Sequence, residues 1–410
     1  MEILIIGGGI GGLTLALSLH EAGIACRVFE AAPEVKPLGV GINLLPHGMR
    51  ELRELGLEQR LAAAAVETRE LRFYNRFGQL IFAEPRGRFA GYDWPQLSIH
   101  RADLHEVLLA ALRQRAGSDC IALGCKCVSI EEQAESVIAK FEHGSAAEGS
   151  CVIGCDGFHS QVRKILYPEE GPPAYQGINM WRGTTRIKPF LDGATMATVG
   201  WLECGKLVVY PIRRQLDDDG RQLINWVAEI QSPRNVMADW NLGGRLEDFY
   251  PTFAGWRFDW LDCAELLKNA EQVLEYPMAD RDPLPYWTRG RVTLLGDAAH
   301  PMYPRGSNGA GQAILDARSL AGCLARESDP QKALQAYEAT RLHAANELVL
   351  RNRSDPPDAI LREVWKRSGD KPFARIEDVI SREELVAISE SYKRVAGFER
   401  ETLAKRGRLA

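Results

Sequence analysis

A glycine-rich turn close to the amino terminus constrains the fold of this chain more than any other feature. A short apolar strand, Glu2 to Ile6, leads into Gly7-Gly8-Gly9-Ile10-Gly11-Gly12, and apolar residues at helical spacing follow from Leu13 to Ala22. Gly23 ends this expected helix, and a second strand runs from Cys26 to Glu30. Strand, glycine turn, helix and strand form the unit that binds a dinucleotide at the edge of a parallel sheet.

Each glycine of this GxGxxG pattern has its own physical purpose. Gly7 permits the tight turn, Gly9 lets the backbone approach a pyrophosphate, and Gly12 lets the helix pack closely on the strand. The free N–H groups at the helix start attract phosphate. Glu30 lies about 20 residues beyond the glycines, where a carboxylate can accept a hydrogen bond from a ribose hydroxyl. The pattern predicts nucleotide binding over a plain glycine turn, and it does not separate FAD from NAD.

Length and composition narrow the class of protein. A chain of 410 residues exceeds what one core usually holds, so we expect two domains. The net charge of −5 and the lack of a basic stripe argue against a nucleic-acid partner. The sequence contains no run of about 18 apolar residues, so we expect no membrane-spanning helix. The nine cysteines include no CxxC pair, which favours free thiols and a cytoplasmic location, and we expect no metal site.

A second site-like turn follows the strand from Ser150 to Gly154. The chain continues as Cys155-Asp156-Gly157, with Ser160 and Arg163 on the next expected helix. An Asp-Gly turn directly after a buried strand can hold a cofactor. The simple alternative is a capped turn with a local ion pair between Asp156 and Arg163.

A third turn follows the strand from Arg291 to Leu295. Gly296-Asp297 ends that strand, and a loop rich in proline and glycine, Pro304 to Gly309, enters a helix from about Ala310. A turn capped by Asp297 has the same ingredients. We expect His300, between turn and loop, to support the loop rather than to act as a base.

Two further positions are candidates for cofactor contact. Gly39 and Gly41, in the loop from Pro37 to Asn43, leave room for the backbone to pass under a flat ring, although a plain connector fits equally well. Arg101 begins a helix, where its charge opposes the helix dipole. A bound anion would remove that conflict, and a solvated arginine is the simple alternative.

Strands dominate the chain from residue 175 to about 275. Several alternate polar and apolar residues, which predicts an antiparallel sheet with one wet face. The large flat side chains on it can form a core or line a wall for an aromatic ligand. We take Trp201, Tyr210 and Trp226 as candidates for that wall. Arg182 and Arg305 can attract a carboxylate, and surface arginines are the equal alternative.

Together these parts predict an α/β fold. A Rossmann-like, discontinuous FAD-binding domain is expected at 1–70, 96–174 and 276–345, and a mainly antiparallel substrate domain at 71–95 and 175–275. The helical segment 346–410 is expected to serve packing or dimer contact. Three nucleotide-type elements, at 7–30, 154–163 and 296–309, suit a long cofactor such as FAD better than NAD. The amides of the Gly306–Gly309 helix entry would face the flavin edge that becomes negative on reduction.

With these motifs the chain resembles the single-component, FAD-dependent class A aromatic hydroxylases, the class of para-hydroxybenzoate and salicylate hydroxylases. The resemblance covers nearly the whole chain and rests on the three turns described above. Within the class it is most similar to the monooxygenases of phenazine biosynthesis, on Pro37 to Asn43, Ser98 to Arg101, Met180 to Gly183 and Tyr276 to Pro285. The flavin loop departs from the class at Ser307 and Asn308, where glycine and glutamine are usual.

The resemblance implies a monooxygenase that hydroxylates a small aromatic or heteroaromatic substrate with O2, through a flavin C4a-hydroperoxide, with or without loss of a carboxylate. NADH or NADPH would visit transiently, since no second GxGxxG unit exists. Rival functions are a flavin oxidase, a halogenase on the same scaffold, or a non-catalytic flavin- or NAD-binding protein. A monomer or homodimer is expected.

Site residues follow from the motifs and the resemblance together. No catalytic residue is assigned, and Tyr303, Pro304 and Arg305 are candidates because they lie beside the expected position of the ring. Cofactor binding is assigned to Gly7, Gly9, Gly12, Glu30, Gly41, Arg101, Asp156, Asp297, Pro304, Gly306, Asn308 and Gly309. Substrate binding is assigned to Trp201, Tyr210, Trp226 and Arg182.

Overall fold

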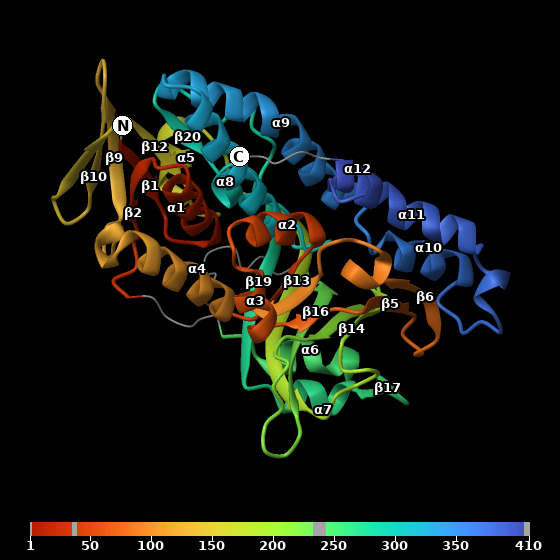
Figure 1. Cartoon of the computed structure of the whole chain (residues 1–410). Coiled ribbons are helices and arrows are strands. Elements are labelled where there is room, and N and C mark those ends of the chain that lie inside the picture. The colour runs from red at the N-terminus through yellow and green to blue at the C-terminus, as the bar shows by residue number, and fades with distance from the viewer. Residues whose placement is uncertain (1, 35–38, 233–242, 406–410) are drawn as a thin grey trace.

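The computed structural model describes residues 2–34, 39–232 and 243–405. Pro37 and Leu38, which belong to the second glycine loop, and the last residues of the expected tail, 406–410, lie outside the described residues. Figure 1 shows the parallel strands near the amino terminus in the upper part of the molecule and the larger sheet below them. The carboxyl-terminal helices extend along one side of both.

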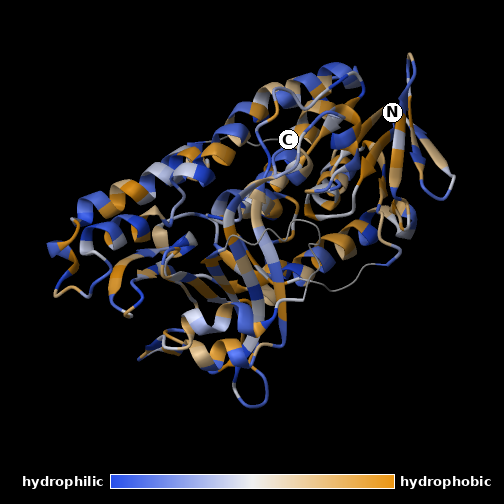
Figure 2. Ribbon diagram, turned by 180° about the vertical axis from the view of Figure 1, so that it is seen from behind, coloured by the Kyte–Doolittle hydropathy of each residue, from blue (hydrophilic) through white to orange (hydrophobic). Residues whose placement is uncertain are grey.

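Five parallel strands form the first sheet. Its order is β20-β12-β1-β2-β8, with bounds Val292–Leu294, Cys151–Gly154, Glu2–Ile6, Ala25–Phe29 and Ile121–Ala122. The two central strands are buried on both faces, as parallel strands covered by helices are. Figure 2 shows this hydrophobic colouring on the strands near the amino terminus. The predicted Rossmann-like α/β arrangement is confirmed.

Helices cover this sheet. The first helix of the dinucleotide unit, α1, packs against α4 and α8, and α8 packs against α2 and α9. The helix bounds are Ile10–Glu21 (α1), Pro46–Glu54 (α2), Glu58–Ala64 (α3), Arg101–Ala116 (α4), Gln161–Leu166 (α5), Gly309–Arg326 (α8) and Pro330–Ser354 (α9). A small antiparallel sheet extends the region, with β9 at Cys127–Glu132, β10 at Val137–Phe141 and β11 at Ala146–Gly149.

The glycine turn explains why α1 starts where it does. Gly7 has a φ of 109°, in the region that favours glycine. A Cβ at Gly12 would lie 2.0 Å from the Gly7 carbonyl oxygen. Neither position can carry a side chain, so both glycines are needed for the helix to begin directly beneath the end of β1.

Seven strands form the second sheet, in the order β19-β13-β16-β15-β14-β5-β6. Neighbouring strands are antiparallel except β14 and β5, which are parallel. The bounds are Glu70–Tyr74 (β5), Leu80–Pro85 (β6), Ala174–Ile187 (β13), Thr195–Trp201 (β14), Gly205–Pro211 (β15), Gln222–Gln231 (β16) and Gln272–Asp280 (β19). The mainly antiparallel sheet predicted from the alternation is therefore present.

The two faces of this sheet have different roles. One face packs into an apolar core with α6 (Leu246–Phe253), α7 (Cys263–Lys268) and the short strands β17 (Arg257–Phe258) and β18 (Leu261–Asp262). The other face turns towards a third small sheet, which is made of β3 (Gly41–Leu44), β7 (Leu97–His100) and β4 (Val66–Glu67). That inner face lines the candidate site.

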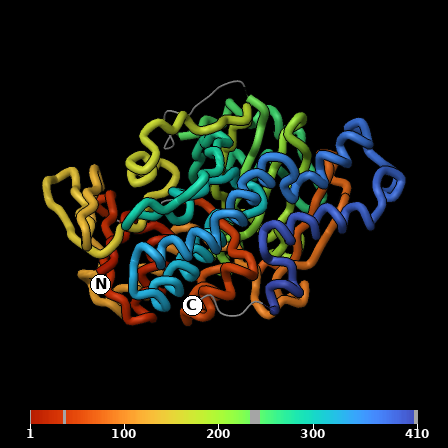
Figure 3. The backbone as a smooth tube through the Cα atoms, turned by 90° about the horizontal axis from the view of Figure 1, so that it is seen from above, coloured from red at the N-terminus to blue at the C-terminus, as the bar shows by residue number. Residues whose placement is uncertain are grey.

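The carboxyl-terminal segment folds back onto both parts. Figure 3 shows the long helix α9 crossing the molecule and the later helices running beside it. These are α10 (Ala359–Ser368), α11 (Arg382–Val395) and α12 (Arg400–Lys405). α10 packs on β14 and β5, and α11 packs on α9. Within the part of the chain that the structure describes, no helix is long and apolar enough to cross a membrane.

Candidate active site

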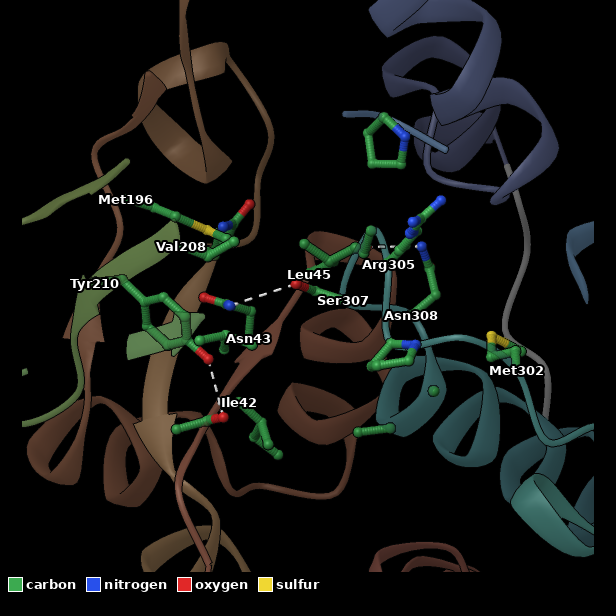
Figure 4. Close-up of a pocket in the computed structure, with 18 of the residues that line it drawn as sticks. Ile42, Asn43, Leu45, Met196, Val208, Tyr210, Met302, Arg305, Ser307 and Asn308 are labelled. Carbon is green, nitrogen blue, oxygen red and sulfur yellow. Dashed lines mark hydrogen bonds between the residues drawn. The ribbon is translucent and has the colours of Figure 1, made fainter. Parts of the chain in front are cut away.

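A cavity of about 410 Å³ lies where the two sheets, the glycine turns and the carboxyl-terminal segment meet. Figure 4 shows Met196, Val208 and Tyr210 on one side of it, facing Arg305, Ser307 and Asn308 on the other. Of the residues assigned to cofactor binding, the cavity is lined by Gly9, Gly41, Arg101, Asp297, Pro304, Gly306, Asn308 and Gly309. The structure thus brings together residues that are far apart in the sequence.

The first glycine turn is open towards this cavity. Gly9 is the N-cap residue of α1, and no side chain bonds to the free N–H groups there. A Cβ added at Gly9 would meet no atom within 4 Å. Gly7, Gly12 and Glu30 are not among the residues that line the cavity. The Glu30 carboxylate accepts from the backbone N–H of Gly8 at 2.7 Å and of Ala32 at 2.8 Å. These bonds fix the turn and leave the amides at the start of α1 free for an anion.

Asp156 has a different set of partners from the expected ones. Its carboxylate accepts from the Ser160 hydroxyl and from the backbone N–H of Gln161 at 2.7 Å and Val162 at 3.1 Å, so it caps α5. Burial outweighs these hydrogen bonds and raises the pKa of Asp156. Asp156 does not line the cavity, whereas its neighbour Gly157 does.

The simple alternative for this turn is confirmed in its cap, but the ion pair between Asp156 and Arg163 that it included is not formed. Arg163 pairs with Glu170 at 2.6 Å and donates to the carbonyls of Ala298 and Ala299 at 3.1 and 2.8 Å. A buried guanidinium needs several acceptors at once, and these groups supply them, whereas Asp156 is used by the helix cap. Arg163 therefore ties the second turn to the third.

The third turn is held by a buried charge network. His300 Nε2 lies 2.6 Å from Asp316 Oδ2, and Arg341 Nε donates to Asp316 Oδ1 at 2.7 Å. Burial alone would raise the pKa of Asp316, but His300 and Arg341 lower it to about 2. Asp316 also accepts from the Gly296 N–H at 3.1 Å, so the network fixes the turn that carries Asp297. His300 supports the loop in this way, as predicted.

Asp297 itself is exposed to the cavity, although protein surrounds it on its other sides. Loss of hydration raises its pKa against the opposing effect of His300 and Arg101. A Cβ at Gly309 would lie 3.7 Å from its Oδ1, which places the carboxyl close to the start of α8. Asp297 and the α8 amides therefore act on the same region of the cavity.

The loop before α8 is held from the tail. Asn308 Nδ2 donates to the Gly306 carbonyl and to the Tyr392 hydroxyl, both at 2.9 Å. The Asn308 side chain does not cap α8, and its Oδ1 has no hydrogen-bond partner. Ser307, where the resembled class usually has glycine, has a φ of 58°, in the left-handed region. The first amides of α8 stay available to a ligand as a result.

The second glycine loop is clamped by the large sheet. The Gly41 N–H donates to Asn225 Oδ1 at 2.7 Å, and the Gly41 carbonyl accepts from Tyr210 and Arg182, both at 2.9 Å. A Cβ at Gly41 would lie 2.5 Å from the Ile212 side chain. Only glycine lets the backbone approach the sheet this closely.

The substrate candidates divide into two groups. Tyr210 and Arg182 line the cavity, whereas Trp201 and Trp226 lie in apolar cores. Side chains alternate across a strand, so Val227 faces the cavity and Trp226 packs on the opposite face, where it donates to Thr185 Oγ1 at 3.0 Å. Of the catalytic candidates, Pro304 and Arg305 line the cavity, and Tyr303 is fully buried outside its lining.

Comparisons with known proteins agree with this geometry. The FAD binding domain family matches residues 1–191 and 260–352. The chain is 42% identical to the phenazine 1,6-dicarboxylic acid hydroxylase PhzS of Lysobacter antibioticus, over 96% of this chain and 97% of that protein. It is 36% identical to the 3-amino-4-hydroxybenzoate 2-monooxygenase of Streptomyces cremeus, over 86% of each. The chain belongs to the FAD-dependent aromatic monooxygenases.

The fold of this monooxygenase also matches solved structures. Klebsiella pneumoniae HpxO, complexed with FAD and uric acid, superposes with a TM-score of 0.76 at 23% identity, over 98% of this chain and 97% of that one. This likeness shows the fold, and the named relatives, which are aromatic hydroxylases and monooxygenases, show that its activity is hydroxylation of an aromatic substrate.

The residues present in the monooxygenase fit FAD. Two helix starts without side-chain caps, at Gly9 and Asn308, border one cavity, and the open position at Gly9 leaves room for a phosphate. Arg101 is exposed at the start of α4, with its side chain available to a pyrophosphate. The orphaned Oδ1 of Asn308 adds a free acceptor at the other end.

Sequence reasoning missed most polar residues on the substrate side of the monooxygenase cavity. These are Arg86, Thr198, Lys206, Glu229, Asp358, Ser389 and Lys393. The signal for some of them was available, because alternation from Tyr210 places Val208 and Lys206 on the same face of β15. No local pattern indicates that the tail residues reach the cavity.

Proposed function

We propose that this monooxygenase hydroxylates a flat, fused heteroaromatic ring of the phenazine type. The observation that carries the proposal is the apolar inner face of the large sheet, which lies opposite the Ser307–Gly309 helix entry. Its residues are Leu71, Phe73, Met180, Met196, Val208 and Val227. The Lysobacter antibioticus relative is a phenazine 1,6-dicarboxylic acid hydroxylase, which supports a ring system of this size.

The site residues would hold FAD along the cavity. The Gly7–Gly12 turn, Glu30 and Arg101 suit its adenosine and pyrophosphate, and Asp297 suits its ribityl region. Asp156 would act through the turn that it caps. Gly41, Pro304, Gly306, Asn308 and Gly309 would contact the ring system. When bound, FAD supplies the chemistry: it takes a hydride from NADH or NADPH and delivers electrons to O2, so that one oxygen atom enters the substrate and the other leaves as water.

The protein's own task is to position and to protect. Methionine and valine side chains of the sheet exclude water from the ring, which limits side reactions. The N–H groups at the start of α8 supply partial positive charge where the flavin edge becomes negative. Tyr210 and Arg182 fix the Gly41 backbone rather than attack the substrate. We expect the enzyme to work as a monomer or homodimer in the cytoplasm without nucleic acid.

The test is a direct assay of the purified protein. It should be yellow, with a flavin spectrum, and should consume NADH or NADPH and O2 when phenazine-1-carboxylate or phenazine-1,6-dicarboxylate is added. Mass spectrometry should find a product with one added oxygen, with or without loss of CO2. A panel of single-ring hydroxybenzoates is the control. A faster and better coupled reaction with the single rings would refute the phenazine-type substrate.

A further inference from the structure

The charge of the cavity lining is opposite to that of the whole protein. The chain carries a formal charge of −5. Among the described lining residues, six are cations and three are carboxylates: Arg86, Arg101, Arg182, Lys206, Arg305 and Lys393, against Glu229, Asp297 and Asp358. A positive cleft in a negative protein attracts anions. Arg101 would suit the pyrophosphate of FAD, and Arg182 donates to the Gly41 carbonyl at 2.9 Å.

Most of these cations are already neutralised or engaged. Lys206 pairs with Glu229 at 2.7 Å and with Asp358. Arg86 and Lys393 share Glu84, at 2.9 and 2.8 Å. These pairs are buried or nearly so, and a ligand would have to break an existing ion pair to use them.

Arg305 is different. It is 8% exposed, and its Nε and Nη2 are sealed from solvent with no hydrogen-bond partner among the described residues. Its guanidinium makes no ion pair with any carboxylate that the structure describes. Its charge lowers the pKa of Asp358, although burial opposes this and Lys206 contributes more. The guanidinium of Arg305 therefore interacts electrostatically with the Asp358 carboxylate without forming an ion pair with it.

The other buried arginines show how unusual this is. Each of them has a carboxylate partner: Arg50 with Glu51, Arg86 with Glu84, Arg163 with Glu170, Arg318 with Glu21 and Arg341 with Asp316. A buried charge is costly unless it is paired and hydrogen-bonded. No described carboxylate offsets this cost for Arg305 with an ion pair, and a substrate anion would do so.

Position supports the same conclusion. Arg305 precedes the Gly306–Gly309 helix entry and lies across the cavity from Met196 and Val208 (Figure 4). A ring held on the sheet could therefore present a substituent to the guanidinium while another of its carbons faces the cofactor loop. Arg305 Nη1, which is not among the sealed atoms, could donate a charge-assisted hydrogen bond to a carboxylate, and such a bond is stronger than one between neutral groups.

We propose that Arg305 is the carboxylate-binding residue of the substrate site, so that the enzyme selects aromatic acids over their neutral analogues. This inference rests on the proposed function, because it places the substrate in the same cavity. It assigns to one side chain the choice of an anionic ring and the orientation of that ring in the cavity.

The test compares an acid with its neutral isostere in the FAD-loaded enzyme, without NADH or NADPH. Phenazine-1-carboxylate and phenazine-1-carboxamide are titrated, and binding is followed by the change in the flavin spectrum. The native enzyme should bind the acid more tightly. Arg305→Met should weaken binding of the acid about 10- to 100-fold, as expected for loss of charge-assisted hydrogen bonds, and leave the amide nearly unchanged. Arg305→Lys should fall between, because it keeps the charge but not the shape and reach of the guanidinium.

A matched control removes a cation elsewhere. Arg375→Met changes an arginine whose side chain is 74% exposed and should alter neither affinity. Equal loss of both ligands in Arg305→Met would mean a structural role and would overturn the proposal. So would an unchanged preference for the acid. If the variants do not fold, the native enzyme still tests the proposal, because equal binding of the acid and the amide would refute it. Binding is measured without turnover, so failure of hydroxylation is a separate result.

Discussion

Tyr392→Phe is a single-atom change that tests how the tail holds the flavin-side loop. The Tyr392 hydroxyl accepts from Asn308 Nδ2 at 2.9 Å and donates to Asn352 Oδ1 at 2.8 Å. A Cβ added at Gly306 would lie only 2.0 Å from the Tyr392 hydroxyl oxygen, so the loop and the tail are in close contact. Through this one oxygen, α11 and α9 are bonded to the loop that begins α8.

The size of the expected stability loss follows from the burial of the two asparagines that bond to the Tyr392 hydroxyl. Asn308 is 1% exposed and Asn352 is 0% exposed, so neither amide can turn to solvent when the hydroxyl is removed. Each buried group left without a partner costs about 1–3 kcal/mol. Asn308 keeps its bond to the Gly306 carbonyl, so its loss falls at the low end. We expect Tyr392→Phe to lower the free energy of unfolding by about 2–4 kcal/mol.

The assay is equilibrium urea unfolding combined with titration of FAD. Because Asn308 loses its anchor, FAD affinity should fall roughly five- to tenfold, the equivalent of about 1 kcal/mol. Tyr337→Phe is the matched control: it is also fully buried, but its hydroxyl makes one bond, to the Leu294 carbonyl at 3.2 Å. That control should cost about 1 kcal/mol and leave FAD affinity nearly unchanged.

Two results would refute this reasoning. The first is a Tyr392→Phe variant within about 0.5 kcal/mol of the parent, which would mean that the buried amides find other partners. The second is equal behaviour of the two phenylalanine variants in FAD titration. The tail would then stabilise the protein without acting on the loop.

Three further predictions use other parts of the site. Gly12→Ala should unfold the cofactor region, because its Cβ would lie 2.0 Å from the Gly7 carbonyl, whereas Gly9→Ala, with no atom within 4 Å, should melt like the parent and retain less FAD. In the folded protein the pKa of Asp316 is lowered to about 2, so ionised Asp316 contributes about 2 kcal/mol to the free energy of unfolding. This contribution is complete above about pH 4 and is lost as the pH falls through 2. Asp316→Asn should abolish this acid-dependent loss in unfolding curves taken across that pH range. Ser307→Gly should raise the free energy of urea unfolding by up to about 1 kcal/mol, because the φ of 58° suits glycine, and a clear loss would show that the Ser307 hydroxyl matters more than the backbone.

Local patterns predicted the parts of the fold that depend on neighbouring residues. The glycine turn predicted β1, α1 and β2 because its spacing is dictated by one packed unit. Alternation predicted an antiparallel sheet in the region from 175 to about 275, where β13 to β16 lie, since one face of such strands is apolar. The strands β5 and β6 pair as an antiparallel hairpin across a short turn that contains Phe77 and Gly78, which is again a local feature.

Other features depended on partners that are distant in the chain. The parallel pairing of β14 with β5 joins residues more than a hundred positions apart, and no turn between them indicates it. Trp226 was placed on the cavity wall because it is large and aromatic, but strand register decides its face and Val227 takes that place. The ion pair of Arg163 with the nearby Asp156, which the simple alternative included, is not formed, and the partners of Arg163 include the carbonyls of Ala298 and Ala299.

The tail is where sequence reasoning missed most and where the site gains most. Its helices carry ordinary amphipathic patterns, which predict packing and nothing else. The structure places Asp358 at the start of α10 against Lys206 of the sheet, and Tyr392 of α11 on the loop that carries Arg305. In the proposed function, the sheet would form the wall for a ring, the start of α8 would face the reacting edge of the cofactor, and the tail would close the end where the unpaired guanidinium lies. A change of substrate charge would therefore need changes in the loop and the tail together, while the glycine turns could stay as they are.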